Sequence, residues 1–194
     1  MNSKDFSIHG RNMLIWGGGG KTTLAKALSK KLGLPFVELD ALYWLPDWGE
    51  RPDEEFTQIV DETLADLENG WVVDGQYGGH LGPLVLKKAD TLIWLRLSGR
   101  VIFWRIFRRS IRRARDKRLI CGENVESWRN TFFSPKSLPW WYIKLLLGGG
   151  YKKSIARREQ QVRESGGHAT VIYLTSARQL EEFYAAHELI RAAD

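Results

Sequence analysis

The chain has 194 residues, 43% of them hydrophobic, which suits one α/β domain with a closed core and argues against global disorder. Its longest apolar runs, Thr91–Leu95 and Ile143–Leu147, are too short to cross a bilayer, and residues 1–10 lack the apolar centre of a secretory signal. The single cysteine, Cys121, excludes an intrachain disulfide, so we expect a cytoplasmic protein.

The formal net charge of +6 is distributed unevenly. Basic residues crowd the segment from Arg96 to Arg118, where Asp116 is the only acidic residue, whereas Asp40–Glu68 is acidic. A local basic block indicates a polyanion, namely nucleotide phosphates, nucleic acid or an anionic membrane. A solvated helix face is the alternative reading of the same block.

The N-terminal half alternates strand-like and helix-like segments. An apolar run at Asn12–Trp16 predicts a strand, and the apolar spacing of Thr22–Leu32 predicts a helix after a run of glycines. Pro35–Leu39 predicts a second strand. Pro52–Glu68 predicts a second helix, because proline and three acidic residues suit its first turn and an apolar stripe follows. A third strand is predicted at Trp71–Val73.

The C-terminal half continues the alternation around one irregular stretch. Thr91–Leu97 predicts a fourth strand, and Val101–Arg113 predicts an arginine-rich helix. Residues 116–150 are rich in Trp and Pro, and we expect them to be irregular apart from a short helix near residues 140–147. A charged helix, a fifth strand and a last helix that opens with a capping box are then predicted at Lys152–Glu164, Thr170–Leu174 and Ser176–Ala193.

Strands that alternate with helices imply a parallel sheet covered on both faces. Such a sheet binds its ligands outside the carboxyl ends of the strands. The residues at those ends form a chemically coherent set: Gly17–Lys21, Asp40, Asp74, Arg96 and Ser176. We therefore expect residues 1–194 to form a single domain, with a lid or insertion at about residues 108–150.

The strongest motif is a glycine run that leads into Lys21, Thr22 and Thr23. Backbone N–H groups of a glycine loop between a strand and a helix can surround one anion. In a P-loop the lysine then reaches the β- and γ-phosphates of ATP, and the next hydroxyl ligates Mg²⁺. The sequence therefore predicts ATP binding by Gly17, Gly18, Gly19, Gly20, Lys21, Thr22 and Thr23, with Thr22 also a metal ligand. A tight turn or a flexible linker is the alternative.

The loop departs from the usual spacing of G-x-x-x-x-G-K-[ST]. When Gly20, Lys21 and Thr22 occupy the end of that pattern, Ile15 stands where the first glycine belongs, so the loop is one or two residues short. Either a stretch is missing or the loop is contracted, and a contracted loop would wrap a β-phosphate poorly.

Two aspartates follow predicted strands and are candidate catalytic residues together with Lys21. Asp74 can hold Mg²⁺ opposite Thr22 or bind the acceptor, and a turn aspartate before Gly75 is the plain alternative. Asp40 can accept a hydroxyl proton or orient an acceptor, unless it caps a helix. Core packing is the expected role for most of the nearby aromatic residues, which could instead form a wall for a flat acceptor: Tyr43, Trp44, Trp48 and Tyr77.

The arginines after the fourth strand suit a lid that closes over the nucleotide, because guanidinium groups match phosphate oxygens. Helical spacing allows two sets on one face, Arg105 with Arg109 and Arg112, or Arg108 with Arg112 and Arg115, and does not choose between them. Lid closure would also exclude water and suppress ATP hydrolysis. Arg109 and Arg112 are candidate catalytic residues, and Arg105 is a candidate nucleotide contact.

One further arginine, Arg178, follows the fifth strand. It could stack on the nucleotide base or cap the last helix, and the sequence does not decide.

These segments together resemble the adenylate-kinase-like P-loop kinases, most closely the bacterial group called DNA topology modulation protein or FlaR. The resemblance spans nearly the whole chain and rests on Gly17–Thr23, Leu34–Trp44, Trp71–Tyr77, Ala89–Leu95, the arginine-rich helix and Ser176–Arg178. It implies a P-loop NTPase fold with a five-stranded parallel sheet in the order 2-3-1-4-5, helices on both faces and an arginine-rich lid. It also places Lys21 and Thr22 at the phosphate and Mg²⁺ positions, and Asp40 and Asp74 at acidic strand ends that face the acceptor and the metal. Arg96 departs from the pattern, because relatives often carry an acidic residue there.

The leading functional prediction is a kinase that transfers the γ-phosphoryl group of ATP to a small acceptor, either a nucleotide or another hydroxyl or phosphate compound. Catalysis would rest on positioning and electrostatics, without a covalent enzyme intermediate. The acceptor and the oligomeric state are left open by the sequence.

Two other functions fit the basic block. A nucleotide-responsive, non-catalytic protein could bind nucleic acid through Arg96–Arg118, although no nucleic-acid-reading motif is present. A weaker alternative is attachment to a membrane surface through Trp140, Trp141 and Lys144.

Overall fold

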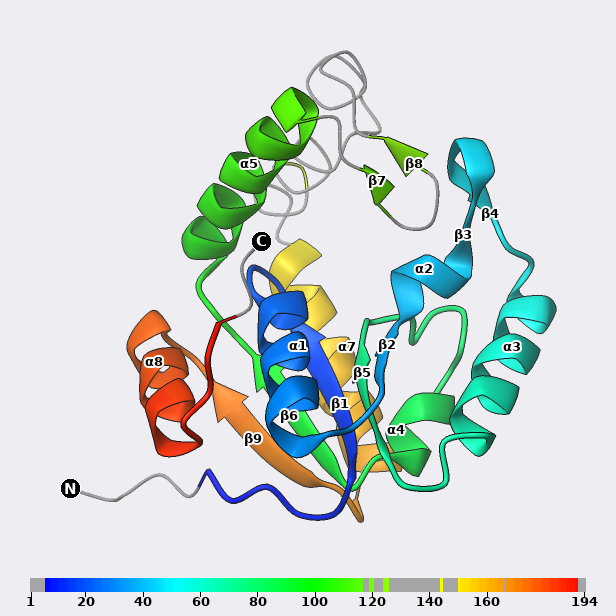
Figure 1. Cartoon of the computed structure of the whole chain (residues 1–194), viewed down its shortest axis with the longest axis horizontal. Helices are drawn as coiled ribbons and strands as arrows, with labels where there is room; N and C mark the ends of the chain where they lie inside the picture. Colours follow the sequence, from blue (N-terminus) through cyan, green and yellow to red (C-terminus); the bar gives the residue numbers. More distant parts are fainter. Residues whose placement is uncertain are drawn as a thin grey trace.

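A five-stranded parallel sheet forms the centre of the computed structural model, which describes residues 6–116, 119–120, 124–125, 144, 150–165 and 167–191 (Figure 1). The strands are β1 (Asn12–Gly17), β2 (Phe36–Glu38), β5 (Trp71–Asp74), β6 (Thr91–Leu95) and β9 (Thr170–Leu174). They lie in the order β2-β5-β1-β6-β9, and every neighbouring pair is parallel. The predicted fold class and the predicted order 2-3-1-4-5 are therefore confirmed.

Helices cover both faces of this sheet (Figure 1). One core packs α1 (Lys21–Leu32), α8 (Ala177–Ala186) and the start of α5 (Gly99–Asp116) against the strands, through residues such as Leu28, Phe183 and Ile102. The opposite core holds α3 (Asp53–Ala65), α4 (Leu84–Lys88) and α7 (Gly150–Ser165), through residues such as Phe56, Leu86 and Val162. Burial on both faces explains why the strands read as continuous apolar runs.

The strand register brings three carboxyl ends to one point. Ile15 of β1 and Glu38 of β2 both pair with Asp74, the last residue of β5. On the other side of β1, Gly17 pairs with Leu95 of β6. Side chains that follow β1, β2 and β5 are therefore neighbours, although they are far apart in the sequence.

Contacts between α7 and the segment that follows β6 tie α7 to the sheet. Arg96, which follows β6, forms an ion pair with Glu159 of α7 at 2.7 Å and lies over the rings of Trp94 and Tyr173. The hydroxyl of Tyr151 donates to the carbonyl of Leu97 at 2.7 Å. Arg96 thus has a structural contact at the position where the resemblance leads one to expect an acidic residue.

The last helix differs from its predicted extent. α8 ends at Ala186 rather than at residue 193, because Glu188 adopts a left-handed backbone with φ of 50°. The capping box is half formed: Ser176 Oγ accepts from Gln179 N at 3.1 Å, but the Gln179 side chain accepts from Thr175 N, one residue before the cap.

Several short elements carry no periodic signal, and the sequence did not predict them. They are α2 (Leu39–Tyr43), β3 (Trp44–Leu45), a 3₁₀ turn η1 (Pro46–Trp48), β4 (Gly49–Glu50), α4, β7 (Leu119–Ile120) and β8 (Asn124–Val125). Asp40, expected at the end of the second strand, lies in the first turn of α2. Most of the expected helix at 140–147, including Trp140 and Trp141, and most of the expected insertion at 108–150 lie outside the described residues. Among those that are described, no helix is long and apolar enough to span a membrane.

Candidate active site

The connection between β1 and α1 consists of three glycines, Gly18–Gly20, so the loop is contracted. Gly17, Gly19 and Gly20 have φ angles of 115°, 70° and 140°, a range that other residues rarely adopt. A Cβ on Gly17 would lie 2.1 Å from the carbonyl oxygen of Leu95. Both the backbone conformation and the close approach of β6 therefore require glycine at the start of this turn.

The N-terminus of α1 has the properties of an anion site. No side chain caps it, and its first turn holds no acidic residue. The first N–H groups of a helix have no partner within the helix, and they lie at the positive end of its dipole. No side chain therefore competes with a bound phosphate for these groups.

Lys21 and Thr22, at this helix end, both contact Asp74 of β5. Lys21 Nζ lies 3.0 Å from Asp74 Oδ1, and Thr22 Oγ1 donates to Asp74 Oδ2 at 2.5 Å. The Asp74 side chain is only 2% exposed, so its negative charge depends on these two partners. The contact between Lys21 and Asp74 Oδ1 is an ion pair whose geometry is not that of a hydrogen bond. Oδ1 therefore has no hydrogen-bond partner in the part of the chain that the structure describes. The structure thus brings together the predicted phosphate lysine and both predicted metal ligands.

These groups fit a Mg²⁺ ion chemically. Hydroxyl and carboxylate oxygens are the ligands that Mg²⁺ prefers, and Asp74 Oδ1 is a buried oxygen to which no described residue donates a hydrogen bond. The described residues contain no cluster of three or more His, Cys, Asp or Glu side chains that could hold a metal. A site with Thr22 and the single carboxylate of Asp74 suits Mg²⁺, because Mg²⁺ usually takes only one or two carboxylates from the protein and also binds the phosphates of a nucleotide.

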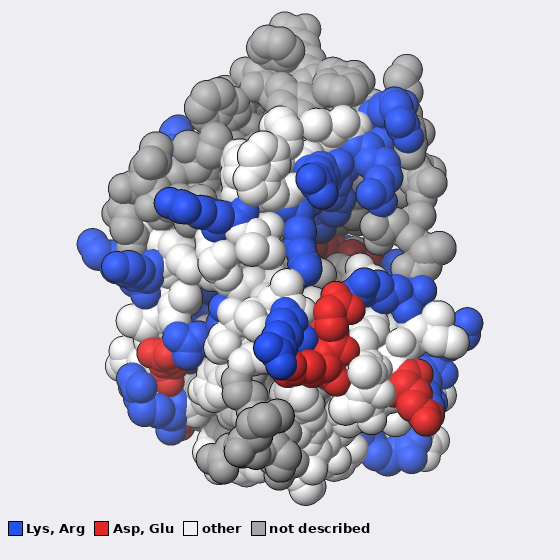
Figure 2. Space-filling view, turned by 90° about the vertical axis from the view of Figure 1, so that its left-hand side faces the viewer, with Lys and Arg blue, Asp and Glu red and all other residues white. Residues whose placement is uncertain are grey.

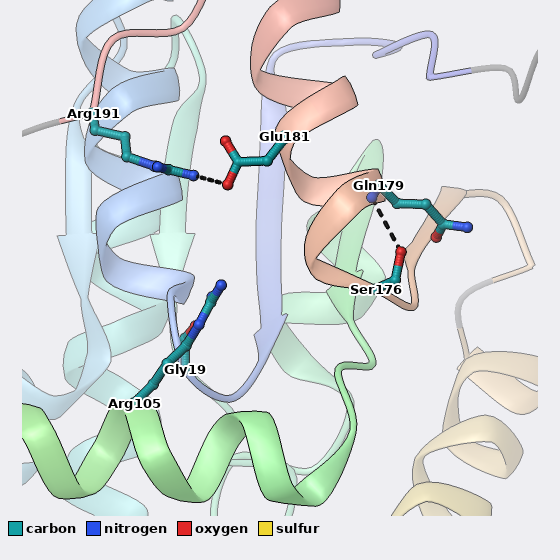
Figure 3. A network of polar contacts seen from close by, with 6 residues as sticks. All are labelled: Gly19, Arg105, Ser176, Gln179, Glu181 and Arg191. Carbon is teal, nitrogen blue, oxygen red and sulfur yellow. Dashed lines mark hydrogen bonds and ion pairs between the residues drawn. The ribbon is translucent and has the colours of Figure 1, made fainter.

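The arginine-rich helix α5 covers one side of the glycine turn. Arg105 reaches the turn from α5, and its Nη1 donates to the carbonyl oxygen of Gly19 at 2.5 Å (Figure 3). Ile102 packs on Gly18 so closely that a Cβ there would lie 2.7 Å from its Cγ2. A cationic side chain therefore lies beside a turn that has fewer backbone N–H groups than a full-length P-loop.

The other candidate arginines lie further from this turn. Arg109 and Arg112 are exposed and sit one and two turns beyond Arg105 on α5, and each makes contacts of its own. Lys and Arg side chains gather over this helix on one face of the molecule (Figure 2). Arg178 is 86% exposed and pairs with Glu182 on α8 at 2.7 Å. Ser176, not Arg178, caps that helix.

The opposite side of the turn, along β5 and β2, carries Asp40 and an aromatic cluster. Tyr77 donates its hydroxyl to Asp40 Oδ1 at 2.6 Å. The ring of Tyr77 lies 4.8 Å from that of Tyr43 and 5.1 Å from that of Phe56. Tyr43 is buried, so it serves core packing, as expected for most of these aromatics. The packed rings hold the Tyr77 hydroxyl in place against Asp40.

Sequence reasoning missed two polar residues on this side. Burial, together with the nearby Asp74 and Asp40 carboxylates, raises the pKa of Glu38 above its ordinary value, against a smaller opposing effect of Lys26 and Lys21. Gln76 has a buried side-chain nitrogen without a hydrogen-bond partner among the described residues. The available signal was their spacing, since Glu38 lies two residues before Asp40 and Gln76 lies two residues after Asp74.

The sheet order, the glycine turn at the end of β1 and the Lys-Thr start of α1 define an α/β P-loop fold. No profile of a known protein family matches the chain. The chain is 34% identical over 115 residues to a Thermococcus gammatolerans protein named "Putative adenylate kinase", and 35% identical over 115 residues to a protein of the same name from Thermococcus onnurineus. Each match covers 57% of this chain and 59% or 58% of the relative, so the chain spans less than two thirds of these relatives' length.

A solved structure supports the same fold class. The gluconokinase from Sinorhizobium meliloti superposes with a TM-score of 0.50, covering 91% of this chain and 89% of that protein. At 16% identity this likeness concerns the fold alone.

Proposed function

We propose that this protein is an ATP-dependent phosphotransferase that moves the γ-phosphoryl group of ATP to a small acceptor. The observation that carries the proposal is the convergence of Lys21 and Thr22, at an uncapped helix N-terminus, on the buried carboxylate of Asp74. A lysine, a hydroxyl and a strand-end carboxylate in this order are the parts that P-loop kinases use. The adenylate kinase name of the archaeal relatives supports the same reaction class.

Each residue has a distinct role in this proposal. The first N–H groups of α1 and the Lys21 ammonium bind the β- and γ-phosphates, and Arg105 adds positive charge from α5. Thr22 and Asp74 would hold Mg²⁺, which when bound neutralises phosphate charge. Asp40, fixed by Tyr77, orients the acceptor hydroxyl.

The proposal includes the exposed arginines and the cellular setting. Arg109 and Arg112 of α5 act on the transferring phosphate, and Arg178 contacts the nucleotide from α8. We place the protein in the cytoplasm, where ATP is available, and we retain the topology modulation group as its family. We do not propose nucleic-acid binding, because the basic block carries no nucleic-acid-reading motif and its Arg105 contacts the glycine turn.

Calorimetry with MgATP tests the proposal on a matched pair of lysine variants of α1. Lys21→Ala should abolish detectable MgATP binding, because it removes the ammonium beside the phosphate seat. Lys30→Ala removes an exposed lysine at the far end of the same helix and should bind like the unmodified protein. Circular dichroism checks that both variants are folded. Wild-type affinity in a folded Lys21→Ala variant would refute the assignment.

A further inference from the structure

The side chains at the ends of β5 and β2, beside the glycine turn, indicate which kind of acceptor could bind there. We propose that the acceptor is a hydroxyl compound without phosphate or carboxylate groups, either a neutral polyol or nucleoside or a hydroxylated amine. This inference rests on the proposed function and specifies the substrate class of the same site.

The acceptor must approach from the β5 and β2 side of the glycine turn. On the β6 side, Ile102 and Arg105 of α5 pack directly against Gly18, Gly19 and Gly20. On the β5 and β2 side, the strand ends carry polar side chains instead. In-line transfer places the incoming oxygen opposite the leaving nucleotide, so these side chains would face the acceptor.

Three carboxylates gather on that side. Glu38 pairs in register with Asp74, and its electrostatic environment includes both Asp74 and Asp40. Among described residues, the cations that act on Glu38 are Lys21 and Lys26. Lys21 is already paired with Asp74, and Lys26 lies over the ring of Phe36. Among the described residues, a second phosphate group on this side would therefore meet carboxylates whose two nearby lysines already have other partners.

One described arginine on this side, Arg51, is turned to other partners. Arg51 donates from Nε to the carbonyl of Leu42 at 2.8 Å, and its Nη1 pairs with Glu55. Recognition of a phosphorylated acceptor usually employs an arginine fork directed at the phosphate. Arg51 is not available for that role in this arrangement.

Hydroxyl groups, in contrast, match the available hydrogen-bonding atoms. Tyr77 occupies Oδ1 of Asp40, whereas Oδ2 has no hydrogen-bond partner among described residues and can accept from a hydroxyl. The buried nitrogen of Gln76 is a donor that has no acceptor within the described part of the chain. A hydroxyl both donates and accepts, so it can satisfy a carboxylate and an amide together.

For any such acceptor, the reaction is a displacement at the γ-phosphorus of ATP. The hydroxyl oxygen forms a bond to the γ-phosphorus, and the bond from that phosphorus to the β–γ bridging oxygen breaks. ADP leaves with the electron pair of the broken bond. The hydroxyl proton passes to Asp40 Oδ2 and then to solvent. Tyr77 acts as a positioning residue, because it touches Asp40 rather than the reacting atoms.

Matched pairs of acceptors test the inference, with ADP release measured in the presence of MgATP. Each pair contains a compound and its phosphorylated derivative: adenosine and AMP, glycerol and glycerol 3-phosphate, ribose and ribose 5-phosphate, and ethanolamine and phosphoethanolamine. We expect turnover with the unphosphorylated member of at least one pair, at least tenfold above its phosphorylated partner. Faster turnover with a phosphorylated member, or no turnover with any unphosphorylated compound, would overturn the acceptor assignment.

Variants separate this assignment from the proposed function. Asp40→Asn should lower kcat at least tenfold with the preferred acceptor while leaving MgATP affinity unchanged, and Tyr77→Phe should lower kcat less than Asp40→Asn does. Asp66→Asn, an exposed carboxylate at the end of α3, should leave both unchanged. Failure of MgATP to bind the unmodified protein would sink the proposed function itself. Intact MgATP binding combined with AMP as the sole acceptor would sink only the acceptor class.

Discussion

The two sides of the glycine turn differ in charge and in packing. On the β6 side, α5 packs Ile102 and Arg105 against the turn, and further arginines lie along this helix. On the β5 and β2 side, Glu38, Asp40 and Asp74 supply negative charge beside a cluster of packed aromatic rings. The β6 side of the turn is therefore closely packed by α5 and basic, whereas the β5 and β2 side is acidic.

Under the proposed function, this difference assigns the phosphoryl donor and the acceptor to different sides of the turn. A nucleoside triphosphate carries several negative charges, so the basic side with the helix N-terminus suits the phosphoryl donor. The acidic side repels a second phosphate and suits a hydroxyl. Lys21 and Asp74 form the boundary, since their ion pair joins α1, the proposed phosphate site, to β5, which faces the proposed acceptor.

Close packing on the donor side predicts the largest effect. Gly17→Ala should lower the free energy of unfolding by about 3 kcal/mol, because the new Cβ meets the Leu95 carbonyl and the φ of 115° is strained. Gly33→Ala, at φ of 64° with no heavy atom near the new Cβ, should cost only about 1 kcal/mol. Urea denaturation of both variants measures the difference. Equal losses would show that β6 does not press on the turn.

Positive charge on the donor side predicts an intermediate effect. Arg105→Ala should weaken MgATP binding roughly tenfold, because a charged hydrogen-bond donor beside the phosphate seat is lost. Arg108→Ala, an exposed residue one turn further along α5, should change the Kd less than twofold. Calorimetry at constant ionic strength gives both values. A larger effect at Arg108 would place the nucleotide on the outer face of α5.

Negative charge on the acceptor side predicts the smallest effect, on stability. Because its pKa is raised in the folded state, Glu38 binds a proton more tightly there than in the unfolded chain. Protonation therefore stabilises the fold fully below the ordinary value of 4.5, and this stabilisation is lost as the pH rises through the raised folded pKa.

Glu38→Gln removes this unfavourable charge and should consequently raise the free energy of unfolding at pH 7. The expected gain is only about 0.5 kcal/mol, because solvent screens a half-buried carboxylate. The gain should shrink as the pH falls toward 4. Denaturation curves of both proteins at the two pH values measure it. A gain that grows toward acid pH would contradict the acidic character of this side.

Much of the fold was predictable because it depends on local periodicity. All five sheet strands and four of the five longest helices lie close to their predicted ranges, since apolar runs and apolar stripes mark them directly. The short elements between Leu39 and Glu50 were missed, because two to five residues are too few to show a period. The end of α8 was predicted too late, since the left-handed turn at Glu188 has no sequence signal.

Parts of the candidate site were predictable for a different reason. Lys21, Thr22 and Asp74 follow glycines or end a strand, and parallel topology brings such positions to one edge. Glu38 and Gln76 were missed because their importance depends on burial and on missing partners, which are properties of the packed molecule. The helical spacing of the arginines also could not show which of them turns inward.

The sequence by itself determined the alternating architecture, the strand order implied by its resemblance, and the glycine, lysine and threonine at the start of α1. These follow from periodicity and from residue chemistry, which act over a few neighbours along the chain. Tertiary structure alone decided that Arg105 contacts Gly19, that Tyr77 holds Asp40, and that the two sides of the turn carry opposite charge. Those facts arise from contacts between residues 37 to 86 positions apart, whose distances only the folded chain sets.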